Sequence, residues 1–221
     1  LRLSSINHIF DVTSKPLIFD ADTGGKAEHF DMKIKTIERA GVSAVIMEDK
    51  TGLKKNSLLQ DTKSQQQEDI KVFADKISIG KKAQISNDFM IIARIESFIL
   101  GKNLDDAMKR ARAYIEAGAD GIMIHSKDKD PKEVFSFASS FRKKYKEIPL
   151  VSVPSTYNQV TEKELINYGF NIVIYANHML RAAYPAMVDV ASKILKNGRA
   201  KETEKKLFSI KDILELIPGT K

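Results

Sequence analysis

One junction recurs along this chain and constrains its fold more than any other feature: a helical pattern ends at a glycine and a short apolar run follows. It occurs at residues 40–44, 117–121 and 168–171. Glycine commonly follows the last turn of a helix, because it adopts a positive φ without steric cost. Helices that alternate in this way with short strands predict repeated βα units, and therefore a parallel sheet.

Six apolar runs are the predicted strands. They are mostly continuously apolar rather than alternating, as is typical of parallel strands that are buried on both faces. The runs cover residues 17–19, 44–47, 90–93, 121–124, 150–153 and 172–175. Amphipathic segments lie between them, and two of these begin with capping signals, Asn103 with Asp106 and Thr161 with Glu164.

Polar side chains follow nearly every predicted strand. They are Asp20, Asp22, Glu48, Arg94, Glu96, His125, Ser126, Ser155 and Asn177. Contributions from so many strands meet at one mouth in a (β/α)8 barrel, whereas an open doubly wound sheet gathers them at one switch point. The expected fold is therefore α/β, a (β/α)8 TIM-type barrel. Because only six strands are recognised and the chain opens on a predicted helix at residues 6–12, the first two βα units are expected to lie outside this sequence.

Length and composition favour one domain. A chain of 221 residues with 43% hydrophobic content can bury one substantial core. We expect a single barrel domain over residues 1–221. Its C-terminal part, about residues 184–217, is expected to form a long helix and a short amphipathic one that pack on the barrel or contact another subunit.

Composition also excludes several classes of function. The chain has no cysteine, which excludes a disulfide framework, a thiolate zinc site and a cysteine nucleophile and fits a reducing compartment. No apolar run reaches membrane-spanning length and the start has no signal-peptide character, so a cytoplasmic location without a membrane partner is expected. The net charge is +7, but the lysines are spread along helices without interleaved aromatic residues. A solvated basic surface is therefore favoured over nucleic-acid binding, and small anionic substrates are expected.

The acids at the first two strand ends are candidate metal ligands. Asp20 and Asp22 are two residues apart, so both side chains point the same way from an extended chain. Glu48, at the next strand end, can complete a carboxylate shell of the kind that Mg²⁺ prefers. The alternative is that Asp22 only caps the following turn.

The remaining candidates have structural alternatives as well. The segment from Lys50 to about Gln67 is long for a βα loop, which is consistent with a lid over a site or with a lysine-rich excursion. Arg94 ends an apolar run and could clamp a carboxylate or phosphoryl group or simply pair with Glu96. His125 is a candidate phosphoryl contact or a structural histidine.

Six ordered segments, taken together, resemble the phosphoenolpyruvate mutases of the isocitrate lyase/phosphoenolpyruvate mutase superfamily. The similarity covers nearly the whole chain to about residue 187. The segments are LIFDADTG at 17–24, EDKTGLKKNS at 48–57, ARIES at 93–97, MIHSK at 123–127, VP at 153–154 and YANHMLRA at 175–182. One departure is that Gly25-Lys26-Ala27 stands where the family usually has a tyrosine and a second glycine.

The resemblance implies an isomerase that interconverts phosphoenolpyruvate and phosphonopyruvate, forming the carbon–phosphorus bond of phosphonate biosynthesis. It also implies a Mg²⁺ cofactor, a homo-oligomer that is usually a tetramer, and a mobile loop after the EDK motif. Carried over by position, Asp20, Asp22 and Glu48 would hold the metal directly or through water. The phosphoryl group would be surrounded by Arg94, Asn56 and His125, and the closed loop would be supported by Lys54 and Ser57.

Three alternatives differ in their chemistry. Isocitrate and methylisocitrate lyases use a loop cysteine, which this chain lacks. Phosphonopyruvate hydrolase shares the metal site and differs mainly in loop residues, and Asn56 favours the mutase over it. A non-catalytic barrel is disfavoured, because a scaffold alone would not require all of Asp20, Asp22, Glu48, Asn56 and Arg94.

Overall fold

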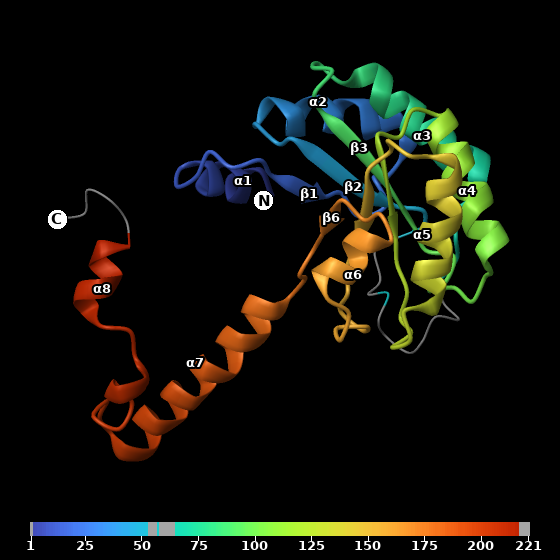
Figure 1. The fold of residues 1–221 in the computed structure, drawn as a ribbon. Coiled ribbons are helices and arrows are strands. Elements are labelled where there is room, and N and C mark those ends of the chain that lie inside the picture. Colours follow the sequence, from blue (N-terminus) through green and yellow to red (C-terminus); the bar gives the residue numbers. More distant parts are fainter. Residues whose placement is uncertain (1, 53–56, 58–64, 217–221) are drawn as a thin grey trace. The chain divides into compact units, whose positions relative to one another are not determined.

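The computed structural model describes residues 2–52, 57 and 65–216 (Figure 1). The chain divides into two compact units, Leu1–Ile174 and Tyr175–Lys221. The first unit contains all the described strands.

The first unit is built on a sheet of six parallel strands whose spatial order is the order of the chain. The strands are β1 (Ile18–Asp20), β2 (Ala44–Glu48), β3 (Met90–Ile95), β4 (Gly121–Ile124), β5 (Leu150–Ser152) and β6 (Ile172–Val173). Consecutive strands are neighbours throughout, so the described sheet has no switch point at which a doubly wound fold would place its ligand. β1 and β6 are the edges of the sheet in the described part of the chain.

Helices separate the strands. They are α1 (Arg2–Phe10), the short 3-10 helix η1 (Ala27–His29), α2 (Phe30–Arg39), α3 (Ile70–Ala83), α4 (Leu104–Glu116), α5 (Lys132–Lys144) and α6 (Glu162–Asn167). Helices α2–α5 lie along one face of the sheet (Figure 1). There they enclose a core to which Val45, Met47, Ile91 and Ala93 contribute.

The alternate strand residues are buried but lie outside this core. Ile46, Ile92 and Met123 are at most 7% exposed, and none of them belongs to the helix-side cluster. Because successive side chains of a strand point to opposite faces, these residues line the face of the sheet away from the helices. The same alternation places Glu48 and Arg94, which are paired in register, on that face.

All six predicted strands are confirmed, with shifts at their ends. β3 runs on to Ile95, and β6 is shorter than predicted because its pairing ends at Val173. The architecture is thus α/β, with six parallel strands forming a half-barrel. The eight-stranded barrel stays a prediction.

The helix caps and the glycine junction that the sequence predicted are also present in the structure. The Asn103 side chain accepts the backbone N–H of Asp106 at 3.0 Å, and Thr161 forms a capping box with Glu164. At the recurring junction, Gly118 has a φ of 103°. In that region a side chain would strain the backbone, which explains glycine there.

The second unit contains α7 (His178–Asn197), the 3-10 helix η2 (Glu204–Lys206) and α8 (Ile210–Glu215). The predicted start of the long helix at residue 184 is wrong, because α7 already begins at His178 and passes through Pro185. A proline within a helix removes one hydrogen bond and weakens the helix without always ending it. Within the described residues, no helix is both long enough and apolar enough to cross a bilayer.

Candidate active site

Charged side chains gather at the carboxyl ends of β2 and β3, on the face away from the helices. We call the group formed by Glu48, Lys50, Ser57, Arg94 and Glu96 the charge cluster. Four of its members come from the ends of two neighbouring strands, and Ser57 comes from the segment that follows β2. Glu48, Lys50, Ser57 and Glu96 are each at most 4% exposed.

Lys50 is held between the two carboxylates. Its Nζ lies 3.3 Å from Glu48 Oε1 and 3.1 Å from Glu96 Oε2. It also donates hydrogen bonds to Ser57 Oγ at 2.8 Å and to Gln65 Oε1 at 3.0 Å. A buried ammonium group is stable only when it is paired in this way.

Arg94 bridges the same groups from the next strand. Its Nε lies 2.6 Å from Glu96 Oε1, and its Nη2 donates to Ser57 Oγ at 2.8 Å and lies 3.5 Å from Glu48 Oε2. The Ser57 hydroxyl in turn donates to Glu96 Oε2 at 2.5 Å. The pair with Glu96, one of the two alternatives for Arg94, is therefore present in the structure. A contact between Arg94 and a phosphoryl group remains a hypothesis.

Both partners of this pair are charged at neutral pH. Burial acts to raise the pKa of Glu96, but the charges of Arg94 and Lys50 and the hydrogen bond from Ser57 outweigh it, and the pKa falls to about 2. Burial acts in the opposite direction on Arg94, and there the carboxylates of Glu96 and Glu48 outweigh it and raise the pKa. The cluster thus combines two cations with two anions.

His125 follows β4 and is 4% exposed. Burial, helped by the charge of Arg94, lowers its pKa to about 3. The imidazole is therefore neutral at physiological pH, with one ring nitrogen able to donate and the other able to accept. Its buried Nδ1 has no hydrogen-bond partner among the described residues, which leaves this atom available to a ligand.

Of the two other candidate metal ligands, Asp20 is the last residue of β1 and Asp22 lies in the turn that follows it. Asp20 is exposed and Asp22 is half-buried. The Asp22 N–H donates to Asp20 Oδ1 at 3.0 Å, and the Asp22 carbonyl accepts the N–H of Glu48 at 2.8 Å. Asp22 adopts a positive φ of 55°, which is uncommon for a residue with a side chain. The backbone thus brings the Asp20–Asp22 turn against the end of β2.

The donor chemistry of these residues fits Mg²⁺. In the part of the chain that the structure describes, no three acidic or histidine side chains already converge as a metal-binding group. Mg²⁺ does not require such a group, because it usually binds through one or two carboxylates and keeps several waters. Asp20, Asp22 and Glu48 supply carboxylate oxygens from two adjacent segments, as that mode requires.

Two predicted site residues, Lys54 and Asn56, lie outside the described residues. The ends of their segment are described: Lys50 and Gln67 form an antiparallel bridge, and the N–H of Thr51 donates to the carbonyl of Gln66 at 2.9 Å. Asn177 precedes α7 at the N-cap position, but its side chain makes no capping hydrogen bond.

Sequence reasoning assigned no role in the site to Lys50 or Gln65. The signal for Lys50 was available, since it stands two residues after Glu48 and residues at that spacing share a face. Gln65 carried no such signal, because its contact with Lys50 spans 15 positions of the chain.

Comparison with known proteins identifies the family. A family model described as phosphoenolpyruvate phosphomutase matches residues 1–195. The chain belongs to the phosphoenolpyruvate phosphomutase family. The resemblance inferred from the six ordered segments is confirmed, and the match includes every predicted site residue.

Relatives within this family carry two different names. The chain is 41% identical over 217 residues to a phosphonopyruvate hydrolase from Variovorax sp. (strain Pal2), covering 97% of the chain and 73% of that protein. It is 35% identical over 215 residues to a phosphoenolpyruvate phosphomutase from Tetrahymena pyriformis, covering 97% of the chain and 70% of that protein. The family therefore supports a mutase or lyase acting on a C–P or C–C bond, and does not by itself decide between mutase and hydrolase.

Solved structures of both kinds of enzyme are similar to this chain. A phosphoenolpyruvate phosphomutase from Streptomyces platensis subsp. rosaceus has a TM-score of 0.90 at 35% identity, covering 97% of this chain and 73% of that one. A phosphonopyruvate hydrolase in complex with oxalate and Mg²⁺ has a TM-score of 0.86 at 39% identity, covering 97% and 72%.

Proposed function

We propose that this chain is a Mg²⁺-dependent phosphoenolpyruvate mutase, an isomerase that interconverts phosphoenolpyruvate and phosphonopyruvate. The observation that carries the proposal is the charge cluster with the neutral His125 on the face away from the helices. It lies next to the carboxylate-bearing turn after β1. Such a site offers both cations for an anionic substrate and oxygen ligands for a divalent metal.

The proposed reaction moves a phosphoryl group within one molecule. The C–P bond of phosphonopyruvate breaks, its electron pair forms the enolate of pyruvate, and the enolate oxygen then takes up the phosphorus. Phosphoryl transfer of this kind depends on positioning and on neutralising charge rather than on covalent help from the protein. A bound Mg²⁺, held by Asp20, Asp22 and Glu48 directly or through water, would supply Lewis-acid stabilisation of the enolate oxygen.

The chain's own residues would orient the transferred group. The positive charges of Arg94 and Lys50 act on His125 and help to lower its pKa, and the neutral imidazole can donate or accept a hydrogen bond without adding charge. Glu96 holds Arg94 and Lys50 in place, as its distances of 2.6 and 3.1 Å to the two cations indicate. Lys54, Asn56 and Ser57 are proposed to exclude water from the phosphoryl group, since capture by water would give hydrolysis instead.

Phosphonopyruvate hydrolase is the second candidate, favoured by the 41% identity to the Variovorax enzyme. In that reaction the same C–P bond breaks but water takes the phosphoryl group, giving pyruvate and phosphate. Asn56 favours the mutase, because that amide matches the mutase loop motif.

Phosphorus NMR separates the candidates. The chain is incubated with phosphonopyruvate and Mg²⁺, with a parallel sample in which a chelator removes the metal. A growing phosphoenolpyruvate signal that disappears with the chelator supports the mutase, whereas free phosphate supports the hydrolase. A spectrum that never changes contradicts both and favours a non-catalytic binding protein.

Assembly and fold completion are further parts of the proposal. We propose that the protein is an eight-stranded barrel and a cytoplasmic homo-oligomer, a dimer or tetramer. The second unit supports the oligomer. Leu180, Tyr184 and Met187 recur on α7 at helical spacing and are 67%, 66% and 59% exposed, and patches of exposed apolar residues mark interaction surfaces. Light scattering with size-exclusion chromatography tests this, and a monomeric mass at micromolar concentration would contradict it.

A further inference from the structure

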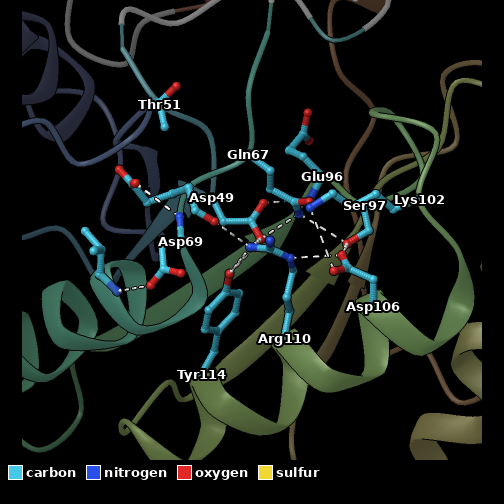
Figure 2. Close-up of polar contacts among 12 residues, drawn as sticks. Asp49, Thr51, Gln67, Asp69, Glu96, Ser97, Lys102, Asp106, Arg110 and Tyr114 are labelled. Atoms are coloured by element: carbon cyan, nitrogen blue, oxygen red, sulfur yellow. Dashed lines mark hydrogen bonds and ion pairs between the residues drawn. The ribbon is translucent and has the colours of Figure 1, made fainter.

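A second polar network lies directly behind the charge cluster, on the side of β2 and β3 that α4 covers (Figure 2). Alternate residues at the strand end point to opposite faces. The side chains of Glu48 and Lys50 therefore point to the face of the sheet that carries the charge cluster, while the side chain of Asp49 between them points toward α4. Asp49 is completely buried, with an exposed fraction of 0%.

Four donors converge on the Asp49 carboxylate. Its Oδ1 accepts the backbone N–H of Glu96 at 2.9 Å. Its Oδ2 accepts the Tyr114 hydroxyl at 2.7 Å, the Gln67 amide at 2.9 Å and Arg110 Nη1 at 3.1 Å. Two of the four donors, Arg110 and Tyr114, come from α4, so this helix supplies half of the hydrogen bonds that hold the Asp49 side chain.

Arg110 is itself held in one orientation. It is 4% exposed, and its Nε donates to Asp106 Oδ2 at 3.0 Å, one turn earlier on α4. Its Nη1 donates to the carbonyl of Glu68 at 2.9 Å and to the Tyr114 hydroxyl at 2.9 Å (Figure 2). A guanidinium with several fixed acceptors loses little additional freedom when it pairs with a carboxylate.

Asp49 joins the two strands beyond their last regular pair. Register pairing of β2 with β3 ends at Glu48 and Arg94. Beyond that point the Asp49 N–H donates to the Arg94 carbonyl at 3.0 Å, and Asp49 Oδ1 accepts the Glu96 N–H. The Asp49 carboxylate therefore fixes the backbone from which the Glu96 side chain reaches Arg94 and Lys50.

We propose that Arg110 and Tyr114 are positioning residues of the candidate active site, which act through Asp49 to hold the ion pair between Arg94 and Glu96. The inference deepens the proposed function and rests on it for its catalytic consequence. Neither side chain belongs to the charge cluster, and both reach it through Asp49. Arg110 has a second connection through Asp106, whose Oδ2 also accepts the hydroxyl of Ser97, the neighbour of Glu96, at 2.7 Å, so Tyr114 is the cleaner probe of the path through Asp49. A purely structural network would instead hold α4 against the sheet without affecting that ion pair.

The chain offers a matched control for the structural alternative. Lys81 Nζ donates to both carboxylate oxygens of Asp120 at 2.8 Å, and Asp120 Oδ2 accepts the N–H of Ile91 at 2.7 Å. This is the same chemistry, a helix cation on a carboxylate that bonds the β3 backbone. It lies at the amino end of β3 rather than at the carboxyl end.

The test uses the full chain with Tyr114→Phe, Arg110→Met and the control Lys81→Met. The readout is the Nε–H signal of Arg94 in a ¹H–¹⁵N NMR spectrum, assigned by its loss in Arg94→Lys. We expect Tyr114→Phe and Arg110→Met to speed exchange of this proton with water by about tenfold, the effect of weakening one hydrogen bond, and Lys81→Met to leave it unchanged. Tyr114→Phe keeps the ring contact with Phe73, whose centroid is 4.8 Å away, so it decides the question even if Arg110→Met does not fold.

Turnover of phosphonopyruvate gives the second readout. We expect Tyr114→Phe to lower kcat about tenfold with little change in KM, and Lys81→Met to change neither after correction for stability. An exchange rate of Arg94 Nε–H in Tyr114→Phe equal to that in Lys81→Met would overturn the positioning role. If exchange responds as expected but the unmodified chain turns over no substrate, the proposed function fails and the positioning role stands.

Discussion

At the scale of single residues, the charge cluster shows how buried ions are kept in place. Arg94 lies on β3 and Glu96 directly follows that strand, and their side chains are 2.6 Å apart. Removing one partner of such a pair is costly, because it leaves the other charge buried and uncompensated. The cluster must therefore be treated as one unit when it is mutated.

We predict that Glu96→Gln lowers the free energy of unfolding by about 3 kcal/mol, because Arg94 and Lys50 lose their shared counter-charge. Urea denaturation measures the loss. The matched control is Glu116→Gln, which removes the carboxylate paired with Arg112 at 2.7 Å, where both side chains are 62% exposed. That change should leave the stability almost unchanged, since exposed pairs contribute little. Equal losses in the two variants would contradict the buried pairing.

The neutral His125 gives a pH prediction. Its pKa is lowered from 6.5 to about 3 in the folded protein, so between these values the unfolded chain binds a proton that the folded chain does not. Stability should therefore fall as the pH drops from about 6.5 toward 3, by up to about 1.4 kcal/mol per pH unit from this group.

Denaturation midpoints measured across that range test the contribution of His125. The decrease of stability per pH unit should be smaller in His125→Asn than in the unmodified chain. His29→Asn, which changes an exposed histidine, should show the same decrease as the unmodified chain. If stability depended on pH equally in both variants, the conclusion that His125 is buried in its neutral form would be wrong.

At the scale of elements, α4 links fold and site. Its amphipathic face contributes Ala107, Ala111 and Tyr114 to the core, and the same helix carries Arg110 to Asp49. The helix begins at a side-chain cap from Asn103. The position of α4 along its axis therefore matters to the site as well as to packing.

Replacing that cap tests the link. Asn103→Ala should lower the free energy of unfolding by about 1 kcal/mol, because the N–H of Asp106 loses its acceptor. Asn103→Asp should retain most of the stabilisation that the cap provides. Thermal denaturation compares the variants. A loss of the same size in Asn103→Asp would show that the amide makes some contact other than the cap.

At the scale of the whole molecule, ligand binding should increase the stability of the folded protein. A ligand that binds only the folded state at 100 times its Kd stabilises it by about 2.7 kcal/mol. A related hydrolase was crystallised with oxalate and Mg²⁺, so we predict that the two together raise the melting temperature of this chain more than either alone.

Asp20→Ala should abolish the shift caused by oxalate and Mg²⁺ while lowering the melting temperature of the free protein only slightly, because Asp20 is exposed and its Oδ1 accepts the N–H of Asp22. Asp88→Ala, which changes an exposed acid before β3, should keep the shift. An undiminished shift in Asp20→Ala would count against its assignment as a metal ligand.

Local sequence patterns were sufficient to predict the strand–helix repeat, the approximate positions of the strands and the family. Apolar runs, capping pairs and junction glycines are local signals, and each of them acts within a few residues of the chain. The six strands, the Asn103 cap and the positions of Glu48, Arg94 and His125 at strand ends could be predicted for that reason. The start of α7 could not be predicted, because Pro185 is typical of the first turn of a helix, whereas α7 begins at His178 and continues through the proline.

Only the tertiary structure decided which charges meet. Asp49 reaches Arg110 across 61 positions and Tyr114 across 65, and Ser57 reaches Glu96 across 39. Nothing in the local sequence specifies these partners. The packing of α4 on β3 and β4 brings Arg110 and Tyr114 to Asp49, and the pairing of β2 with β3 brings the segment after β2 to Glu96. The sequence indicated most of the charged residues of the site but not Lys50, and the packing of the elements determined how they are paired.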